Sequence, residues 1–154
     1  MQMKLAEALI ERRDLQNKLL ELKNLMLANT LVEEGSEPDI EVADLLGQYD
    51  QASKQLEDLI VAITKRNQEV VVTVNGTTCS LQSLLAKRAR LRQKYDLYTS
   101  VLEATRENRR FGRNEIRMVK TVSVKDFTEK LDELAKALRQ TDGVIQQTNW
   151  LEEL

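Results

Sequence analysis

Apolar side chains recur every three and four residues through most of this chain, and this heptad spacing limits the fold more than any other feature. The spacing is clearest between about Ile40 and Asn67, where the a and d positions hold Val42, Leu45, Tyr49, Ala52, Leu56, Leu59 and Ile63. Residues three and four apart lie on one face of an α-helix, so the pattern predicts a long helix that buries a narrow seam against another helix.

Three further stretches carry helical spacing, at about residues 3–29, 81–108 and 123–148. Gly35 and Pro38 separate the first two helices in an acidic corner, since proline cannot continue a helix and glycine accepts a positive φ. Four long helices with short or moderate connections are typical of an antiparallel bundle. We therefore expect a single all-α domain over residues 1–154, folded as an antiparallel four-helix bundle.

Two short pieces are strand-like rather than helical. Residues 70–80 read VVVTVNGTTCS, and Asn75-Gly76 suits a type I′ turn, which requires positive φ at both central residues. This predicts a small β-hairpin at about residues 70–79, and a short extended segment is expected at about residues 115–122. In an up-and-down bundle these pieces fall at opposite ends. A sheet that joins them would have to cross between subunits, so we expect a homo-oligomer.

The composition excludes several kinds of site. The chain has no histidine and a single cysteine, Cys79, which removes catalytic triads, histidine-bound metals and intramolecular disulfides. We expect Cys79 to be a small packed residue, and we expect no metal, no cofactor and no catalytic residue. No signal peptide and no run of about 20 apolar residues is present. The sequence therefore predicts a cytoplasmic protein that does not enter membranes.

Charge is strongly segregated along the chain although the net charge is only −2. Residues 28–60 hold nine acids and one base, a net charge of −8, whereas residues 87–120 hold eleven bases and four acids, a net charge of +7. The basic start of the third helix opposes the helix dipole and needs a partner, for which the acidic second helix is one candidate. The two runs either pair with each other, within or between chains, or the basic run forms an anion-binding surface.

The basic run is densest around a glycine, in the sequence RENRRFGRNEIRMVKTV at residues 106–122. The planar guanidinium of arginine grips phosphate or carboxylate with two parallel hydrogen bonds. The candidate ligand-binding residues here are Arg109, Arg110, Arg113, Asn114, Glu115 and Arg117. Nucleic acid is disfavoured as the ligand, because the pI is about 5.4 and Phe111 is the only aromatic residue among the arginines.

Several polar blocks resemble one known family. MKLAEALIERRDLQ at residues 3–16, AITKRN at 62–67, RFGRNEIRMVKTVSV at 110–124, LAKALRQTD at 134–142 and QQTNWLEEL at 146–154 are similar to the septicolysin-like family of small bacterial proteins. The family name implies a cytolysin, but charge-balanced amphipathic helices argue against pore formation. The resemblance implies a role for Arg66, Asn67 and Trp150, and it supports Arg113, Glu115 and Arg117.

Two functions follow as hypotheses. In the first, the protein is a non-enzymatic homo-oligomer that captures an anionic, nucleotide-like small molecule through the arginine-rich segment, with Trp150 available to stack on a base, and sequesters a signalling nucleotide. In the second, it is a structural or interaction module without a small ligand, and its acidic and basic runs pair subunits or a partner protein. Enzymatic activity is not expected, because no nucleophile has a base beside it.

Overall fold

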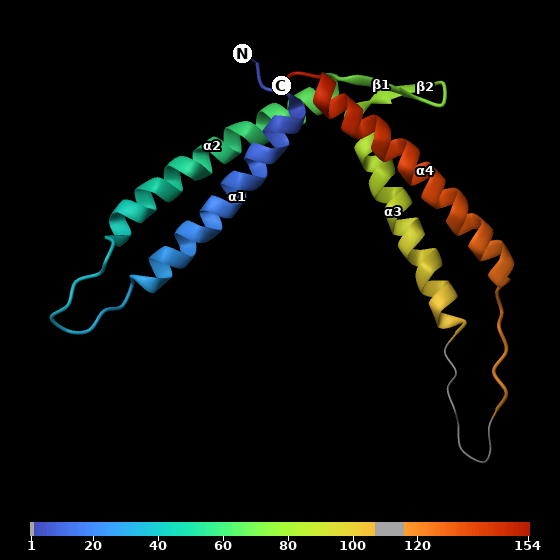
Figure 1. The fold of residues 1–154 in the computed structure, drawn as a ribbon, viewed down its shortest axis with the longest axis horizontal. Coiled ribbons are helices and arrows are strands. Elements are labelled where there is room, and N and C mark those ends of the chain that lie inside the picture. Colours follow the sequence, from blue (N-terminus) through green and yellow to red (C-terminus); the bar gives the residue numbers. More distant parts are fainter. Residues whose placement is uncertain (1, 107–115) are drawn as a thin grey trace. The chain divides into compact units, whose positions relative to one another are not determined.

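The computed structural model describes residues 2–106 and 116–154, and the chain divides into two compact units. The first unit comprises Met1–Val70 with Gln146–Leu154, and the second comprises Val71–Ile145. In chain order the elements are α1 (Leu5–Ala28), α2 (Val42–Glu69), β1 (Val71–Val74), β2 (Thr77–Ser80), α3 (Leu81–Ala104) and α4 (Val124–Leu151) (Figure 1). The all-α class with one small β-hairpin is therefore confirmed, while the single domain stays a prediction.

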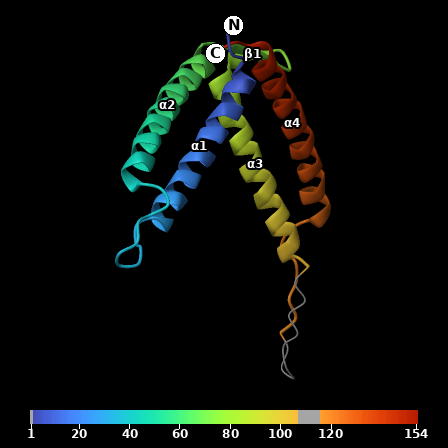
Figure 2. The ribbon, with the colours of Figure 1, turned by 60° about the vertical axis from the view of Figure 1, so that its left-hand side comes forward.

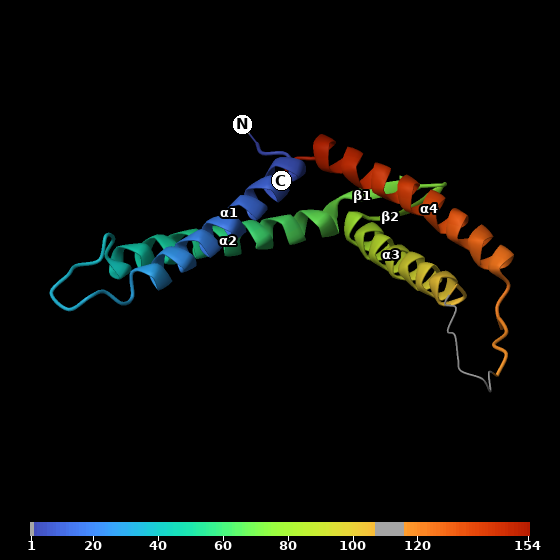
Figure 3. The same cartoon turned by 60° about the horizontal axis from the view of Figure 1, so that its bottom comes forward.

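In the first unit, α1 and α2 form an antiparallel helical hairpin, side by side in all the ribbon views (Figure 1, Figure 2 and Figure 3). The seam is the predicted one, since every residue expected at an a or d position of α2 is buried or half-buried. On α1 the buried positions include Leu5, Ala8, Leu15 and Leu22. The connecting loop is as expected too, because Gly35 has a φ of +86° there.

The second unit begins with the β-hairpin, which forms where the sequence predicts it. Strands β1 and β2 pair antiparallel, with Val72 opposite Cys79 and Val74 opposite Thr77. The turn residues Asn75 and Gly76 have φ values of 51° and 79°, as a type I′ turn requires. Val72 is buried, and Cys79 is a half-buried free thiol, so one face of the hairpin packs while the other faces solvent.

Helices α3 and α4 run antiparallel in the second unit, because the start of α3 contacts the later part of α4 and its end contacts the start of α4. Arg88 pairs with Asp142, and the rings of Tyr98 and Phe127 lie 4.9 Å apart. Ser80 caps α3 by accepting a hydrogen bond from the Ser83 amide at 3.1 Å. Ser123 caps α4 in the same way, since its hydroxyl accepts from the Asp126 amide at 3.2 Å.

Two predicted helix ends are wrong. Helix α3 stops at Ala104 rather than Asn108, because the Thr105 hydroxyl donates to the Leu102 carbonyl and takes the place of a helical partner. Helix α4 continues past Thr148 to Leu151 and passes through Gly143 without a break. Burial of Ile145 and Asn149 explains the extension, since tertiary packing outweighs the low helix propensity of one glycine. Described residues 116–123 form neither helix nor strand.

Candidate functional site

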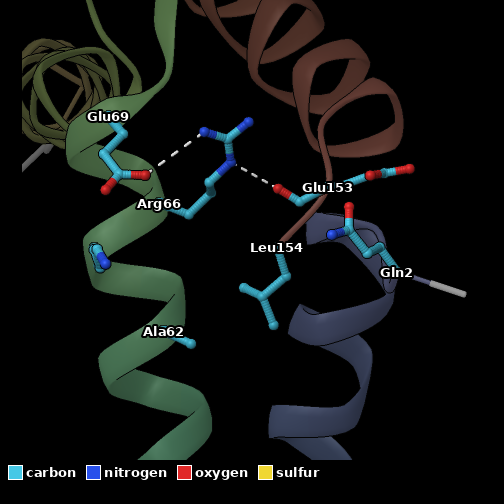
Figure 4. Close-up of a pocket in the computed structure, with 7 residues that line it drawn as sticks. Gln2, Ala62, Arg66, Glu69, Glu153 and Leu154 are labelled. Carbon is cyan, nitrogen blue, oxygen red and sulfur yellow. Dashed lines mark hydrogen bonds and ion pairs between the residues drawn. The ribbon is translucent and has the colours of Figure 1, made fainter.

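Arg66, one of the predicted site residues, is the centre of the best-defined polar cluster. It lies in the last turn of α2, and its half-buried side chain reaches the end of the chain. Nε donates to the Glu153 carbonyl at 2.7 Å (Figure 4). Nη2 donates to the Glu152 carboxylate at 2.8 Å. Glu69 adds an ion pair at 3.7 Å. The guanidinium is therefore committed to groups of its own chain.

The groups that Arg66 binds belong to a short pairing of the two ends of the chain, which we call the terminal clasp (residues 3–5 with 152–154). The Leu5 amide donates to the Glu152 carbonyl at 3.0 Å, and the Leu154 amide donates to the Met3 carbonyl at 2.8 Å. Lys4 and Glu153 form an antiparallel bridge, and their side chains lie 3.5 Å apart. Arg66 thus fastens the final residues against the start of α1 and the end of α2.

An open pocket of about 540 Å³ lies beside the clasp. Its lining includes two bases, Lys65 and Arg66, and two acids, Glu69 and Glu153 (Figure 4). Because the acids balance the bases and Arg66 already binds three oxygen atoms, the pocket offers no excess positive charge to an anion. These contacts give Arg66 a structural role, and its role in ligand binding stays a prediction.

The remaining predicted site residues are dispersed or lie outside the described part of the chain. Asn67 is half-buried next to Arg66 on α2, and Trp150 is 55% exposed on α4, so both belong to the first unit. Arg117 is exposed in the second unit. The other five, Arg109, Arg110, Arg113, Asn114 and Glu115, lie outside the described residues. Arg66, Asn67 and Trp150 therefore fall in one unit and Arg117 in the other.

The two charge runs differ in how much of their charge is paired. In the acidic run, Lys54 pairs with Glu57 and Asp58, and the hydrogen bond and charge of Asp58, with the charge of Glu57, raise the pKa of Lys54. Among the described residues of the first unit, the acids at positions 33–50 form no ion pair. In the basic run, Arg88 pairs with Asp142 at 2.7 Å. The acidic second helix was one candidate partner for the start of α3, but within the chain the partner of Arg88 is on α4.

Two classes of site find no support in the part of the chain that the structure describes. No group of three or more cysteine, aspartate or glutamate side chains is arranged to hold a metal ion among residues 2–106 and 116–154. Over the same residues, no helix combines the length and the apolar character that crossing a membrane needs.

Sequence reasoning missed most partners in these clusters. For Arg88, the need of a partner was recognisable, because the basic start of α3 opposes the helix dipole. Its partner Asp142 and the clasp residues Lys4, Glu152 and Glu153 were not, since no local pattern links positions 54 or more residues apart. The septicolysin-like blocks at residues 3–16, 62–67 and 146–154 contain the clasp residues and Arg66, but nothing in them indicates that they meet.

Comparisons with known proteins give matches that cover all or nearly all of the chain. A family model described as a family of unknown function (DUF6847) matches residues 12–154. The chain is also similar to a solved structure, described as a functionally unknown conserved protein from Corynebacterium diphtheriae, with 32% identity and a TM-score of 0.87 over 100% of this chain and 99% of that one. No curated protein matches. Neither finding bears on the septicolysin-like resemblance, which stays a prediction.

Proposed function

Because the chain belongs to the family of unknown function DUF6847, no activity is carried over from its relatives, and we propose that it is a homo-oligomeric helical interaction module. One observation carries the proposal: the helical hairpins bury their heptad seams but leave large apolar side chains outside them exposed. Those on α1 and α2 include Leu20, Leu27, Leu46, Ile60 and Val61. Exposed apolar surface of this kind marks a protein interface.

Some of the exposed apolar residues on α1 and α2 share a helix face. Leu20 and Leu27 are seven residues apart, and Leu46 and Ile60 are fourteen apart, so each pair recurs at one heptad position. A helix that presents such a stripe beside its seam suits a bundle of more than two helices. The proposed oligomer buries these residues between the helices of different copies.

The unpaired charges favour association of copies. Among residues 2–106 and 116–154, no ion pair is formed by the acids of residues 33–50 or by Lys87, Arg90 and Lys94. Lys87, Arg90 and Lys94 also follow a 3-4 spacing and share one flank of α3. Opposite patches of this kind steer two copies into register. The proposed module acts in the cytoplasm and catalyses no reaction.

Molar mass in solution tests the proposal. We expect light scattering and sedimentation to give a dimer or a larger oligomer at micromolar concentration. Replacing Leu46 and Ile60 together by glutamate should lower that mass without loss of helix, because both side chains are exposed within the chain. The matched control replaces Gln48 and Gln55, exposed on the same helix. A wild-type monomer at all concentrations would refute the proposal.

A second candidate function is capture of an anionic, nucleotide-like molecule. It is favoured by Arg106, Arg117 and Lys120, which are exposed and have no ion pair within the described part of the chain. Free guanidinium groups can grip phosphate, and the exposed indole of Trp150 can stack on a base. Sequestration of a signalling nucleotide would be the corresponding role.

A thermal-shift series with mono-, di- and cyclic nucleotides tests this second candidate. A ligand at one hundred times its dissociation constant stabilises the folded state by about 2.7 kcal/mol, which for this chain length raises the melting temperature by roughly 5–11 °C. Arg117→Ala should abolish the shift, while Lys130→Ala on α4 should leave it intact. The absence of a shift with every nucleotide would remove this candidate and leave the interaction module.

A further inference from the structure

Residues 116–121 form a stretch of free backbone with strand-like side chains. Ile116, Met118 and Val119 are 80%, 75% and 73% exposed, and no backbone hydrogen bond in the described part of the chain involves these six residues. Exposed apolar side chains on a backbone without hydrogen-bond partners are the features of a strand that lacks its neighbour.

The β-hairpin of the same unit has an edge that such a strand can use. Val74 and Thr77 flank the two-residue turn and bond to each other, so alternate residues of β1, Val71 and Thr73, direct their N–H and C=O groups outward. The corresponding edge of β2 is interrupted, because Ser80 caps α3. Val71 is also exposed. A two-stranded hairpin is only marginally stable alone, so a third strand on β1 would stabilise it.

The segment cannot easily reach this edge within its own chain. The hairpin adjoins the first residue of α3, whereas residues 116–121 precede α4, whose start contacts the far part of α3 through Tyr98 and Phe127. Helix α3 has 24 residues and is about 36 Å long. Figure 1 shows the segment continuing from the start of α4 away from the hairpin.

We propose that residues 116–121 of a second copy add to the outer edge of β1 as a third strand, and that the exchange is reciprocal. Two antiparallel copies of the second unit bring the segment of each to the level of the hairpin of the other. The contact is then isologous and closes as a symmetric dimer. This inference rests on the proposed self-association and adds the surface through which it occurs.

The alternation of side chains fixes which face each residue takes. Ile116 and Met118 are two apart and share one face of the added strand, where they extend the apolar face that carries buried Val72. Arg117 and Val119 then share the solvent face with Val71 and Thr73. The basic residues Arg117 and Lys120 remain near water on either face at the edge of the sheet, where charged residues discourage further strand addition.

Disulfide trapping tests the arrangement in a Cys79→Ser background. Thr73→Cys on one copy is mixed with Arg117→Cys, Val119→Cys or Thr121→Cys on a second copy that carries a mass tag, and the mixture is oxidised gently. We expect one of the three to form a mixed disulfide efficiently, because a disulfide requires Cα atoms within about 7 Å and a sheet has one register. Glu129→Cys, exposed on α4, is the control that should not react.

A pair of proline variants tests the edge itself. Thr73→Pro removes an N–H that points outward from β1, and Thr78→Pro removes the equivalent N–H of β2. Both variants lose the same contact of 3.3 Å between the Thr73 and Thr78 hydroxyl groups, so that loss cancels in the comparison. Thr73→Pro should raise the dimer dissociation constant about tenfold, since each of two symmetric contacts loses a hydrogen bond. Thr78→Pro should not.

The outcomes separate this inference from the proposed function. Strand exchange is overturned if the protein is a dimer but forms no mixed disulfide. It is also overturned if Thr73→Pro and Thr78→Pro weaken the dimer equally. Self-association remains supported in both cases. A Thr73→Cys, Val119→Cys double variant that closes an internal disulfide as a monomer overturns it too. A protein that is monomeric throughout removes both proposals.

Discussion

Replacing Arg66 by alanine should loosen the terminal clasp, and the size of the effect can be worked out from its contacts. Arg66 makes two charge-assisted hydrogen bonds, at 2.7 Å to the Glu153 carbonyl and at 2.8 Å to the Glu152 carboxylate. Each such bond contributes about 1.5–3 kcal/mol when it is shielded from water. Because the side chain is 31% exposed, we expect the free energy of unfolding to fall by about 2 kcal/mol in total.

Two measurements check this prediction. Urea denaturation followed by circular dichroism gives the free energy of unfolding, and a loss of about 2 kcal/mol corresponds to a melting temperature about 4–8 °C lower for a chain of this size. Amide hydrogen exchange locates the change. The amides of Leu5 and Leu154, which donate across the clasp, should lose about tenfold or more of their protection, since local opening becomes easier.

The neighbouring substitution Lys65→Ala is the matched control. Lys65 is exposed, lies on the same turn of α2 and takes part in none of the clasp hydrogen bonds, so we expect a change below about 0.5 kcal/mol. Equal effects of Arg66→Ala and Lys65→Ala, or unchanged exchange at Leu5 and Leu154, would refute the assignment of Arg66 to a structural role.

Three further predictions concern the two units. Arg88→Ala should destabilise the protein by about 1–3 kcal/mol in thermal unfolding, because it removes a 2.7 Å ion pair to Asp142 in which the Arg88 side chain is only 20% exposed. No loss of stability would show that the pair is dispensable. Gly76→Ala should cost about 1 kcal/mol, since the turn holds a φ of +79° there, whereas Gly47→Ala, in open space on α2, should gain up to about 1 kcal/mol by the same assay. Ser80→Ala should cost about 1 kcal/mol through loss of the α3 cap, and a neutral result in denaturant titration would argue against that cap.

The sequence by itself determined those elements that depend on neighbours within a few positions. The seam residues of α2 follow from the 3.6-residue period of the helix, the Asn75-Gly76 turn from its need for positive φ, and the α3 and α4 starts from hydroxyl caps at Ser80 and Ser123. Each of these is decided by local backbone geometry, so a short stretch of chain is enough to predict it. The sequence did not predict the ends of α3 and α4, at Ala104 and Leu151. The first depends on a side-chain hydrogen bond that competes with the helix, and the second on tertiary packing.

Only the tertiary structure decided which charged groups meet. Arg66 and Glu152 are 86 positions apart, and Arg88 and Asp142 are 54 apart, so their pairing depends on how long helices align and where the chain ends return. From sequence, Arg66 is one free arginine among many that could hold an anion. In the fold its guanidinium donates hydrogen bonds to Glu152 and Glu153 of the terminal clasp. A half-buried cation requires acceptors, and these two residues supply them.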